Sequence, residues 1–93
     1  MLFGEMTEVS GVAFYASELS GILGLGYDAI SMNRIPTFID TADLKTKDFA
    51  FYLKTNPEES YMTLPGYDTN IMNPTNLQMH NVVEQRYWSL KLT

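Results

Sequence analysis

Residues 20–31 of this 93-residue chain read SGILGLGYDAIS and are its most distinctive stretch. Between Gly21 and Tyr27, apolar side chains are interspersed with three glycines. Glycine within an apolar run often marks a place where another backbone comes close, because a side chain there would obstruct the approach. The spacing does not suit an amphipathic helix. The stretch therefore predicts a buried strand, or a loop, packed tightly against another segment.

Several other segments have the composition or the alternation of strands. Residues 11–15, GVAFY, are short, apolar and rich in residue types that favour strands. Phe49 to Leu53 alternates with a period of two, and after a turn at Asn56 to Glu59 the chain returns as Tyr61 to Leu64. These two runs predict an antiparallel pair. A last alternation, over Tyr87 to Leu92, predicts a terminal strand.

One short helix is predicted after Pro36, because proline is favoured in the first turn of a helix. Lys45 and Lys47 lie near its expected C-terminus, where positive charge is favourable. Between Pro36 and Lys45, apolar residues recur at roughly helical spacing; they are Phe38, Ile39, Ala42 and Leu44. Asp68 to Asn76 is predicted to be a loop. The residues alone thus indicate a mainly β chain with one or two helical turns.

The composition excludes several classes of protein. With 45% hydrophobic residues the chain is too apolar for a disordered tail and should form a core. At 93 residues and without cysteine, its independent stability is expected to be marginal. Six basic against eleven acidic residues, a net charge of −5, argue against a nucleic-acid partner. No apolar run reaches the length of a membrane span, and no targeting pattern is present.

His80 and Glu84 are the residues that first suggest a metal or acid–base pair, because residues four apart share one face of a helix. The β-branched Val82 and Val83 between them favour a strand instead, and a strand would hold the two side chains too far apart to chelate closely. No further ligand motif accompanies them. No metal site and no cofactor are therefore predicted.

Two further patterns have simpler structural explanations. The glycine spacing G-x-x-G-x-G at residues 21–26 is the reverse of the dinucleotide-binding pattern, so tight packing is favoured over phosphate binding. Pairs of carboxylates close together in the sequence could act as acid–base couples, but nothing nearby predicts the burial that would separate their pKa values. Solvated faces or helix caps explain them better. The pairs are Glu5 with Glu8, Asp40 with Asp43, and Glu58 with Glu59.

The order of six short motifs resembles the middle of the pepsin-like aspartic proteases. In chain order they are FGEMTE (residues 3–8), SGILGLGYDAIS (20–31), PTF (36–38), DFAFYL (48–53), TLPGYD (63–68) and YW (87–88). Six landmarks in the family's order, covering nearly the whole chain, are far more specific than any single motif. The resemblance implies a fragment of the bilobal pepsin-like fold, made of strands of the N-terminal lobe and the interlobe sheet with one or two short helices.

The resemblance also implies how the chain is organised and what it lacks. It implies a single partial domain, with residues 1–48 in the N-terminal lobe and residues 49–93 in the interlobe sheet and the start of the C-terminal lobe. In this family two aspartates, each in an Asp-Thr-Gly motif, share a water that attacks the peptide bond. Asp40 and Asp68 are followed by threonine but not by glycine, so neither motif occurs. The chain is expected to be a central segment of an endopeptidase that has no catalytic residue and is inactive alone.

The same matching implies substrate-binding positions and partners. Ala13, Leu19 and Ile22 would line the unprimed substrate pockets and Tyr87 would border the primed side, with core packing as the alternative for each. The implied partners are the remaining segments of the protease fold and, in an intact parent, a peptide or protein substrate. No nucleic acid and no membrane are expected. The family's compartment would be secreted, lysosomal or vacuolar. A non-catalytic protease-like binding or structural module, which pairs its strand edges with a partner chain, remains an alternative.

Overall fold

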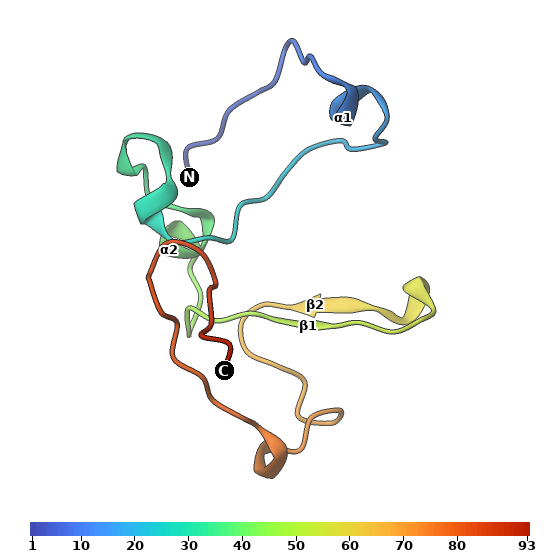
Figure 1. Ribbon diagram of the computed structural model, residues 1–93, viewed down its shortest axis with the longest axis vertical. Coiled ribbons are helices and arrows are strands. Elements are labelled where there is room, and N and C mark those ends of the chain that lie inside the picture. Colours follow the sequence, from blue (N-terminus) through green and yellow to red (C-terminus); the bar gives the residue numbers. More distant parts are fainter.

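The most regular part of the chain is an antiparallel hairpin. The computed structural model describes residues 1–93 and places strand β1 at Ala50–Tyr52 and strand β2 at Tyr61–Thr63 (Figure 1). Tyr52 lies opposite Tyr61, with their ring centroids 5.3 Å apart. The predicted antiparallel pair is confirmed. Its alternation and its turn residues are close together in the sequence, so this hairpin can form from local information alone.

Polar contacts hold the turn between the two strands. The 3₁₀ helix η3, Pro57–Glu59, begins after Asn56, whose side chain accepts a backbone amide hydrogen bond. The ammonium group of Lys54 lies 2.6 Å from a carboxylate oxygen of Glu59. The amide of Lys54 donates to the hydroxyl of Ser60 at 2.9 Å. The turn predicted at Asn56 to Glu59 is therefore confirmed.

The helix predicted after Pro36 is present but shorter than its apolar spacing suggests. Helix α2 spans Phe38–Thr41, and Thr37 is its N-cap. The Thr37 hydroxyl accepts a hydrogen bond from the amide of Asp40 at 3.3 Å, and the Asp40 carboxylate accepts one from the amide of Thr37 at 3.0 Å. This reciprocal capping box fixes the start of the helix. Ala42 already has extended backbone angles, because a helix this short needs apolar packing to continue.

The strand predicted at residues 11–15 is wrong, since Val12–Tyr15 forms the single helical turn α1. Gly11 has φ 105°, a backbone conformation that side chains rarely allow, and its carbonyl accepts hydrogen bonds from the amides of Phe14 and Tyr15. No second strand lies beside this segment. The backbone groups that would have bonded across a sheet bond locally instead.

The terminal strand predicted at Tyr87 to Leu92 is also absent, and Gly21 to Tyr27, predicted as a strand or a loop, is not a strand. The only pairing outside the hairpin is an isolated bridge between Gln85 and Trp88. An extended apolar segment becomes a strand only where another backbone pairs with it. Residues 21–27 make a single backbone hydrogen bond to a distant segment, from the amide of Tyr27 to the carbonyl oxygen of Arg86. Residues 87–92 turn back on residues 83–85 through this bridge and through a bond from the amide of Val83 to the carbonyl oxygen of Ser89. These isolated contacts do not extend into a sheet.

The close approach predicted at the glycines is found at only one of them. A side-chain carbon added at Gly26 would lie 2.8 Å from a carbon atom of Ile30, so the Ile30 side chain would have to move to admit it. At Gly21 and Gly24 it would meet nothing within 4 Å. The glycine stretch is therefore closely packed at its C-terminal end and open to solvent at the other two glycines.

The remaining regular structure consists of single 3₁₀ turns. These are η1 at Asp28–Ile30, η2 at Met32–Arg34 and η4 at Pro74–Asn76, the last within the predicted loop. Two of the turns, η3 and η4, begin with proline after an asparagine cap. None of the helices has the length and apolar character that a bilayer crossing requires.

The chain has no hydrophobic core, contrary to the expectation from its composition. None of the 93 residues is buried, and the accessible surface is 8556 Å². A compact domain of this mass would expose about 5,500 Å². The radius of gyration is 16.2 Å, against about 12 Å for a compact chain of this length. Figure 1 shows the reason, because the first twenty residues, the hairpin and the segment around η4 extend in different directions and no layer covers another.

Candidate functional site

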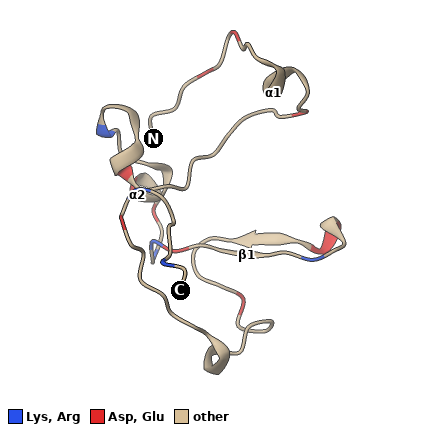
Figure 2. Ribbon diagram, viewed as in Figure 1, with Lys and Arg blue, Asp and Glu red and all other residues tan.

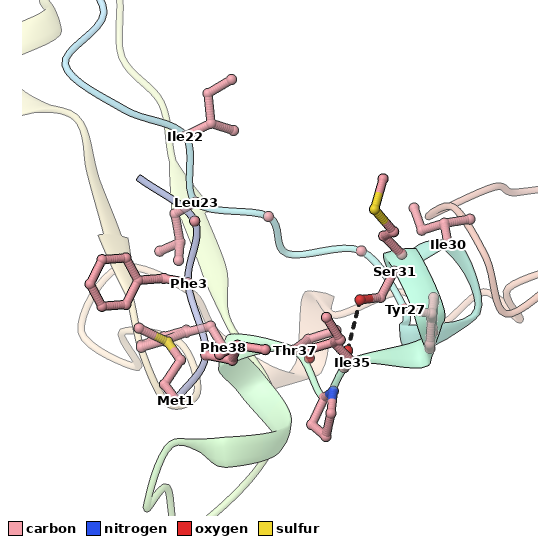
Figure 3. Close-up of a pocket in the computed structure, with 16 residues that line it drawn as sticks. Met1, Phe3, Ile22, Leu23, Tyr27, Ile30, Ser31, Ile35, Thr37 and Phe38 are labelled. Carbon is pink, nitrogen blue, oxygen red and sulfur yellow. Dashed lines mark hydrogen bonds between the residues drawn. The ribbon is translucent and has the colours of Figure 1, made fainter. Parts of the chain in front are cut away.

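An apolar hollow lies between the N-terminal residues and the glycine stretch. It has a volume of about 650 Å³ and is lined by segments from residues 1–4, 22–27 and 30–38. Figure 3 shows the side chains of Phe3, Leu23 and Phe38 gathered on one side of it. Three stretches that are separate in the sequence thus meet around one concave surface.

The lining of the hollow is suited to binding and not to acid–base chemistry. Its ionisable groups are the Tyr27 hydroxyl and the amino terminus of Met1, and it contains no carboxylate and no histidine. The Ser31 hydroxyl donates to the carbonyl oxygen of Ile35 at 2.7 Å and is already satisfied within the chain (Figure 3). Mostly apolar concave surfaces with few polar groups are typical of sites that bind an apolar partner or ligand.

The structure brings one of the four predicted substrate-binding residues to this hollow. Ile22 lies at its edge, apart from the gathered side chains in Figure 3, and is 72% exposed. Ala13 lies in α1, and Leu19 lies in the extended segment that follows; both are exposed and neither lines the hollow. Tyr87 is exposed in the C-terminal segment, next to Trp88.

An aromatic junction beside the hollow was not anticipated from the sequence. The ring centroid of Trp88 lies 4.7 Å from that of Tyr27 and 5.4 Å from that of Phe49. The Trp88 indole N–H donates to the carbonyl oxygen of Leu25 at 2.8 Å, and the amide of Tyr27 donates to the carbonyl oxygen of Arg86. These contacts connect the glycine stretch, the residue just before β1 and the C-terminal segment. The one available signal was that a single tryptophan usually needs a partner for its N–H.

The clearest electrostatic pair joins the start of β2 to the loop after it. The Tyr61 hydroxyl donates to Asp68 at 2.9 Å, and the amide of Asn70 donates to the other carboxylate oxygen of Asp68 at 2.9 Å. The bond from the Asn70 amide, followed by the one from Tyr61, lowers the pKa of Asp68. Desolvation and the neighbouring carboxylate raise the pKa of Tyr61. Both effects favour an ionised Asp68 bonded to a protonated Tyr61. This bond holds the loop that follows β2 against the start of that strand.

The other carboxylates also have structural roles or lie apart. Asp40 completes the capping box of α2, one of the two roles that the sequence suggested for it, and the hydrogen bond from the amide of Thr37 lowers its pKa. Glu59 pairs with Lys54 and raises the pKa of that ammonium group. His80 and Glu84 lie in irregular backbone, neither in the strand that their neighbours favoured nor in a helix. No three metal-ligating side chains come together.

Comparisons with known proteins identify the family. The chain matches the family described as Eukaryotic aspartyl protease over residues 1–93. It is similar to cathepsin D of Mus musculus, with 35% identity over 98% of this chain, and to cathepsin D of Homo sapiens, with 34% identity over 98%. Over 73% of the chain it is 45% identical to vacuolar protease A of Aspergillus fumigatus. The matched region is 24% of each cathepsin D and 19% of the vacuolar protease. The chain spans about a quarter or less of these relatives and belongs to the eukaryotic aspartyl protease family, in agreement with its motif order.

Proposed function

We propose that these 93 residues are a central segment of a pepsin-like aspartic endopeptidase. In this proposal the two catalytic aspartates and the water they activate belong to other segments, because neither Asp-Thr-Gly motif occurs within residues 1–93. The match to the family over the whole chain and the order of the motifs support the assignment. The chain by itself would not hydrolyse peptides.

The observation that carries the proposal is the absence of a core in a chain with 45% hydrophobic residues. The surface exceeds that of a compact domain of the same mass by about 3,000 Å². An excess of this size, with most of the large hydrophobic side chains exposed, marks a surface that other protein covers. In an intact protease the remaining segments would cover it, with residues 1–48 in the N-terminal lobe and residues 49–93 in the interlobe sheet and the start of the C-terminal lobe.

Within that assembly the chain would contribute walls of the substrate cleft. Ala13, Leu19 and Ile22 would contact side chains of the peptide on the unprimed side, and Tyr87 would border the primed side. All four are exposed or at the edge of the hollow, which leaves them free to contact another chain. Residues 21–24 would run beside the first catalytic loop and support it. The compartment would be lysosomal or vacuolar, in keeping with the similarity to vacuolar protease A.

The proposal is tested by expressing the coding sequence that surrounds these residues. The full-length product should hydrolyse peptides at acidic pH, be blocked by an aspartic-protease inhibitor, and lose activity when asparagine replaces the aspartate of either Asp-Thr-Gly motif. The 93-residue chain, purified in the same way, should show no inhibitor-sensitive turnover. A surrounding sequence without the two motifs, or inhibitor-sensitive hydrolysis by the chain alone, contradicts the proposal.

A second candidate is a non-catalytic module that pairs its strand edges with a partner chain. The observation that favours it is the two-stranded sheet, in which β1 and β2 each have one edge without a neighbouring strand. Two Asp-Thr-Gly motifs in the surrounding coding sequence would decide for the protease, and their absence would decide for this candidate.

A further inference from the structure

The two hydrogen bonds that join the most distant parts of the chain meet at one place. The indole N–H of Trp88 donates to the carbonyl oxygen of Leu25 at 2.8 Å, across 63 residues of sequence. The amide of Tyr27 donates to the carbonyl oxygen of Arg86 at 3.3 Å. Together the two bonds tie the end of the glycine stretch to residues 86–88.

Ring packing, and not charge, supports these bonds. The Trp88 ring lies between Tyr27 and Phe49 and meets the Phe49 ring edge-on, with an angle of 86° between the ring planes. Leu25, Tyr27 and Phe49 are half-buried in a chain that buries no residue fully. The charged residues are spread along the chain (Figure 2), and each ion pair joins residues close together in the sequence, namely Asp28 with Arg34, Asp40 with Lys47, and Lys54 with Glu59. The contact between the two segments therefore depends on the indole of Trp88, as a donor and as a ring.

Both partners of each bond lie within residues 1–93, so the contact forms without any other segment of the protein. Segments that cover it in an intact protease would exclude water from the bond between Trp88 and Leu25. A hydrogen bond is stronger in surroundings of low dielectric constant than in water. The same contact should therefore be firmer in the intact protein.

Tyr87 lies between the two residues that are tied to the glycine stretch. Gln85 and Trp88 form an isolated bridge, which places Arg86 and Tyr87 in a tight turn between them. The Tyr87 ring contacts no other aromatic ring of the chain. Its position is therefore determined by its neighbours, through the bonds that Arg86 and Trp88 make to the glycine stretch.

We propose that Trp88 is a positioning residue for the primed side of the substrate. Through its bond to Leu25 it fixes Tyr87, at the primed side of the cleft, relative to residues 21–24, which would support the first catalytic loop. This inference rests on the proposed function and deepens it. Leu25 directly follows the supporting residues, so the bond sets the distance between two parts of the cleft. Residues of a peptide beyond the scissile bond are thereby held in place relative to the catalytic water.

The test uses the full-length protease, expressed from the surrounding coding sequence, and two peptides with the same unprimed residues. The long peptide extends several residues past the scissile bond, and the short peptide ends one residue past it. The measured quantity is the ratio of kcat/KM for the long peptide to kcat/KM for the short one. A disturbance of the catalytic loop slows the hydrolysis of both peptides alike and cancels in this ratio.

Trp88→Phe removes the N–H that bonds to Leu25 and keeps an aromatic ring beside Tyr27 and Phe49. The ratio should fall about fivefold, as expected for the loss of one hydrogen bond. The fall should come mainly from a higher KM for the long peptide, because the lost contact is one of binding. Tyr27→Leu keeps the N–H but removes a ring on which Trp88 packs, and it should lower the ratio about threefold. It tests the proposal independently where Trp88→Phe does not fold.

A double-mutant cycle shows whether Trp88 acts through Tyr87. Tyr87→Ala should lower the ratio by itself, because it removes the side chain that borders the primed side. Adding Trp88→Phe, or Tyr27→Leu, to Tyr87→Ala should lower the ratio no further, since the residue to be positioned is already gone. Effects that multiply would mean that Trp88 serves the fold in general, and they would contradict the proposal.

Tyr61→Phe is the matched control. It also removes one side-chain donor and keeps the ring, but its bond is to Asp68, after the hairpin, so the ratio should not change. A full-length product without inhibitor-sensitive hydrolysis contradicts the proposed function, and this inference falls with it. An active protease whose ratio is unchanged in Trp88→Phe and in Tyr27→Leu contradicts this inference alone.

Discussion

The indole N–H of Trp88 donates to the carbonyl oxygen of Leu25 at 2.8 Å, across 63 residues of sequence. Beside it the rings of Trp88 and Tyr27 lie 4.7 Å apart. In a chain without buried residues, these contacts are the means by which the C-terminal segment is held against the glycine stretch. Trp88 also contacts Phe49, so it links Tyr27, which lines the hollow, to the residue just before β1.

Tyr27→Ala should release this junction. The ring pair is worth about 1 kcal/mol, so its loss should expose Trp88 further to water. Because Trp88 is the only tryptophan, the emission of the chain reports this site alone. We expect emission at longer wavelength and stronger quenching by acrylamide. Tyr67→Ala is the control, since Tyr67 contacts no other aromatic ring. Unchanged emission in Tyr27→Ala would show that the junction does not hold in solution.

Thr37→Ala should destabilise helix α2. The substitution removes the hydroxyl that accepts from the amide of Asp40, which costs about 1 kcal/mol at an N-cap. Amide hydrogen exchange at Asp40, measured by NMR, should become faster by roughly fivefold, in keeping with that energy. Thr37→Ser keeps an accepting hydroxyl and should exchange nearly as slowly as the original chain. Equal acceleration in both variants would mean that the cap is not what orders this turn.

Asp68 should titrate below its ordinary pKa of 3.8, because two hydrogen bonds favour its ionised form. A carboxyl whose pKa is lowered by folding contributes stability above its unfolded pKa, and that contribution disappears as the pH falls through the lowered value. The loop at Asp68 should therefore stay attached to Tyr61 near pH 4 and detach only in stronger acid. The pH dependence of the carboxyl carbon shift of Asp68 measures this directly.

Tyr61→Phe tests the cause of that shift. It removes one of the two donors, so the pKa of Asp68 should rise part of the way toward 3.8, with the bond from Asn70 still in place. Tyr67→Phe, close in sequence and without a bond to Asp68, should leave the pKa where it was. An Asp68 that titrates at 3.8 or above in the original chain contradicts the assigned hydrogen bonds.

What could be predicted from the sequence was what nearby residues determine. The alternation from Phe49 to Leu53, with its turn at Asn56, specified the hairpin, and Pro36 with the apolar spacing after it indicated the helix. The segments around Val12 and Leu90 also favour strands, but a strand needs a partner backbone along its length. None lies beside Val12, and the segment around Leu90 has only an isolated bridge. Local bonds from Gly11 then give a helical turn instead.

The site could be predicted only in part for the same reason. The motif order led to the family, which the match over residues 1–93 confirms. The meeting of Phe3, Leu23 and Phe38 around the hollow, and the contact of Trp88 with Leu25, join residues far apart in the chain. No spacing rule within a single segment carries such information.

The proposal that Ala13 lines a substrate pocket can be tested in the intact protease of which this chain is proposed to be a segment. A smaller residue at a pocket wall leaves a larger pocket, and Ala13 is exposed in α1. Ala13→Phe adds a ring that covers about 150 Å² or more. If Ala13 lines the cleft, kcat/KM for peptides with large unprimed side chains should fall relative to small ones by about 1–3 kcal/mol equivalent, while Tm hardly moves. Val12→Phe, one position earlier, should not discriminate between the peptides. Equal losses for large and small peptides in Ala13→Phe, together with a lowered Tm, would show that Ala13 packs in the core of the parent and does not face the substrate.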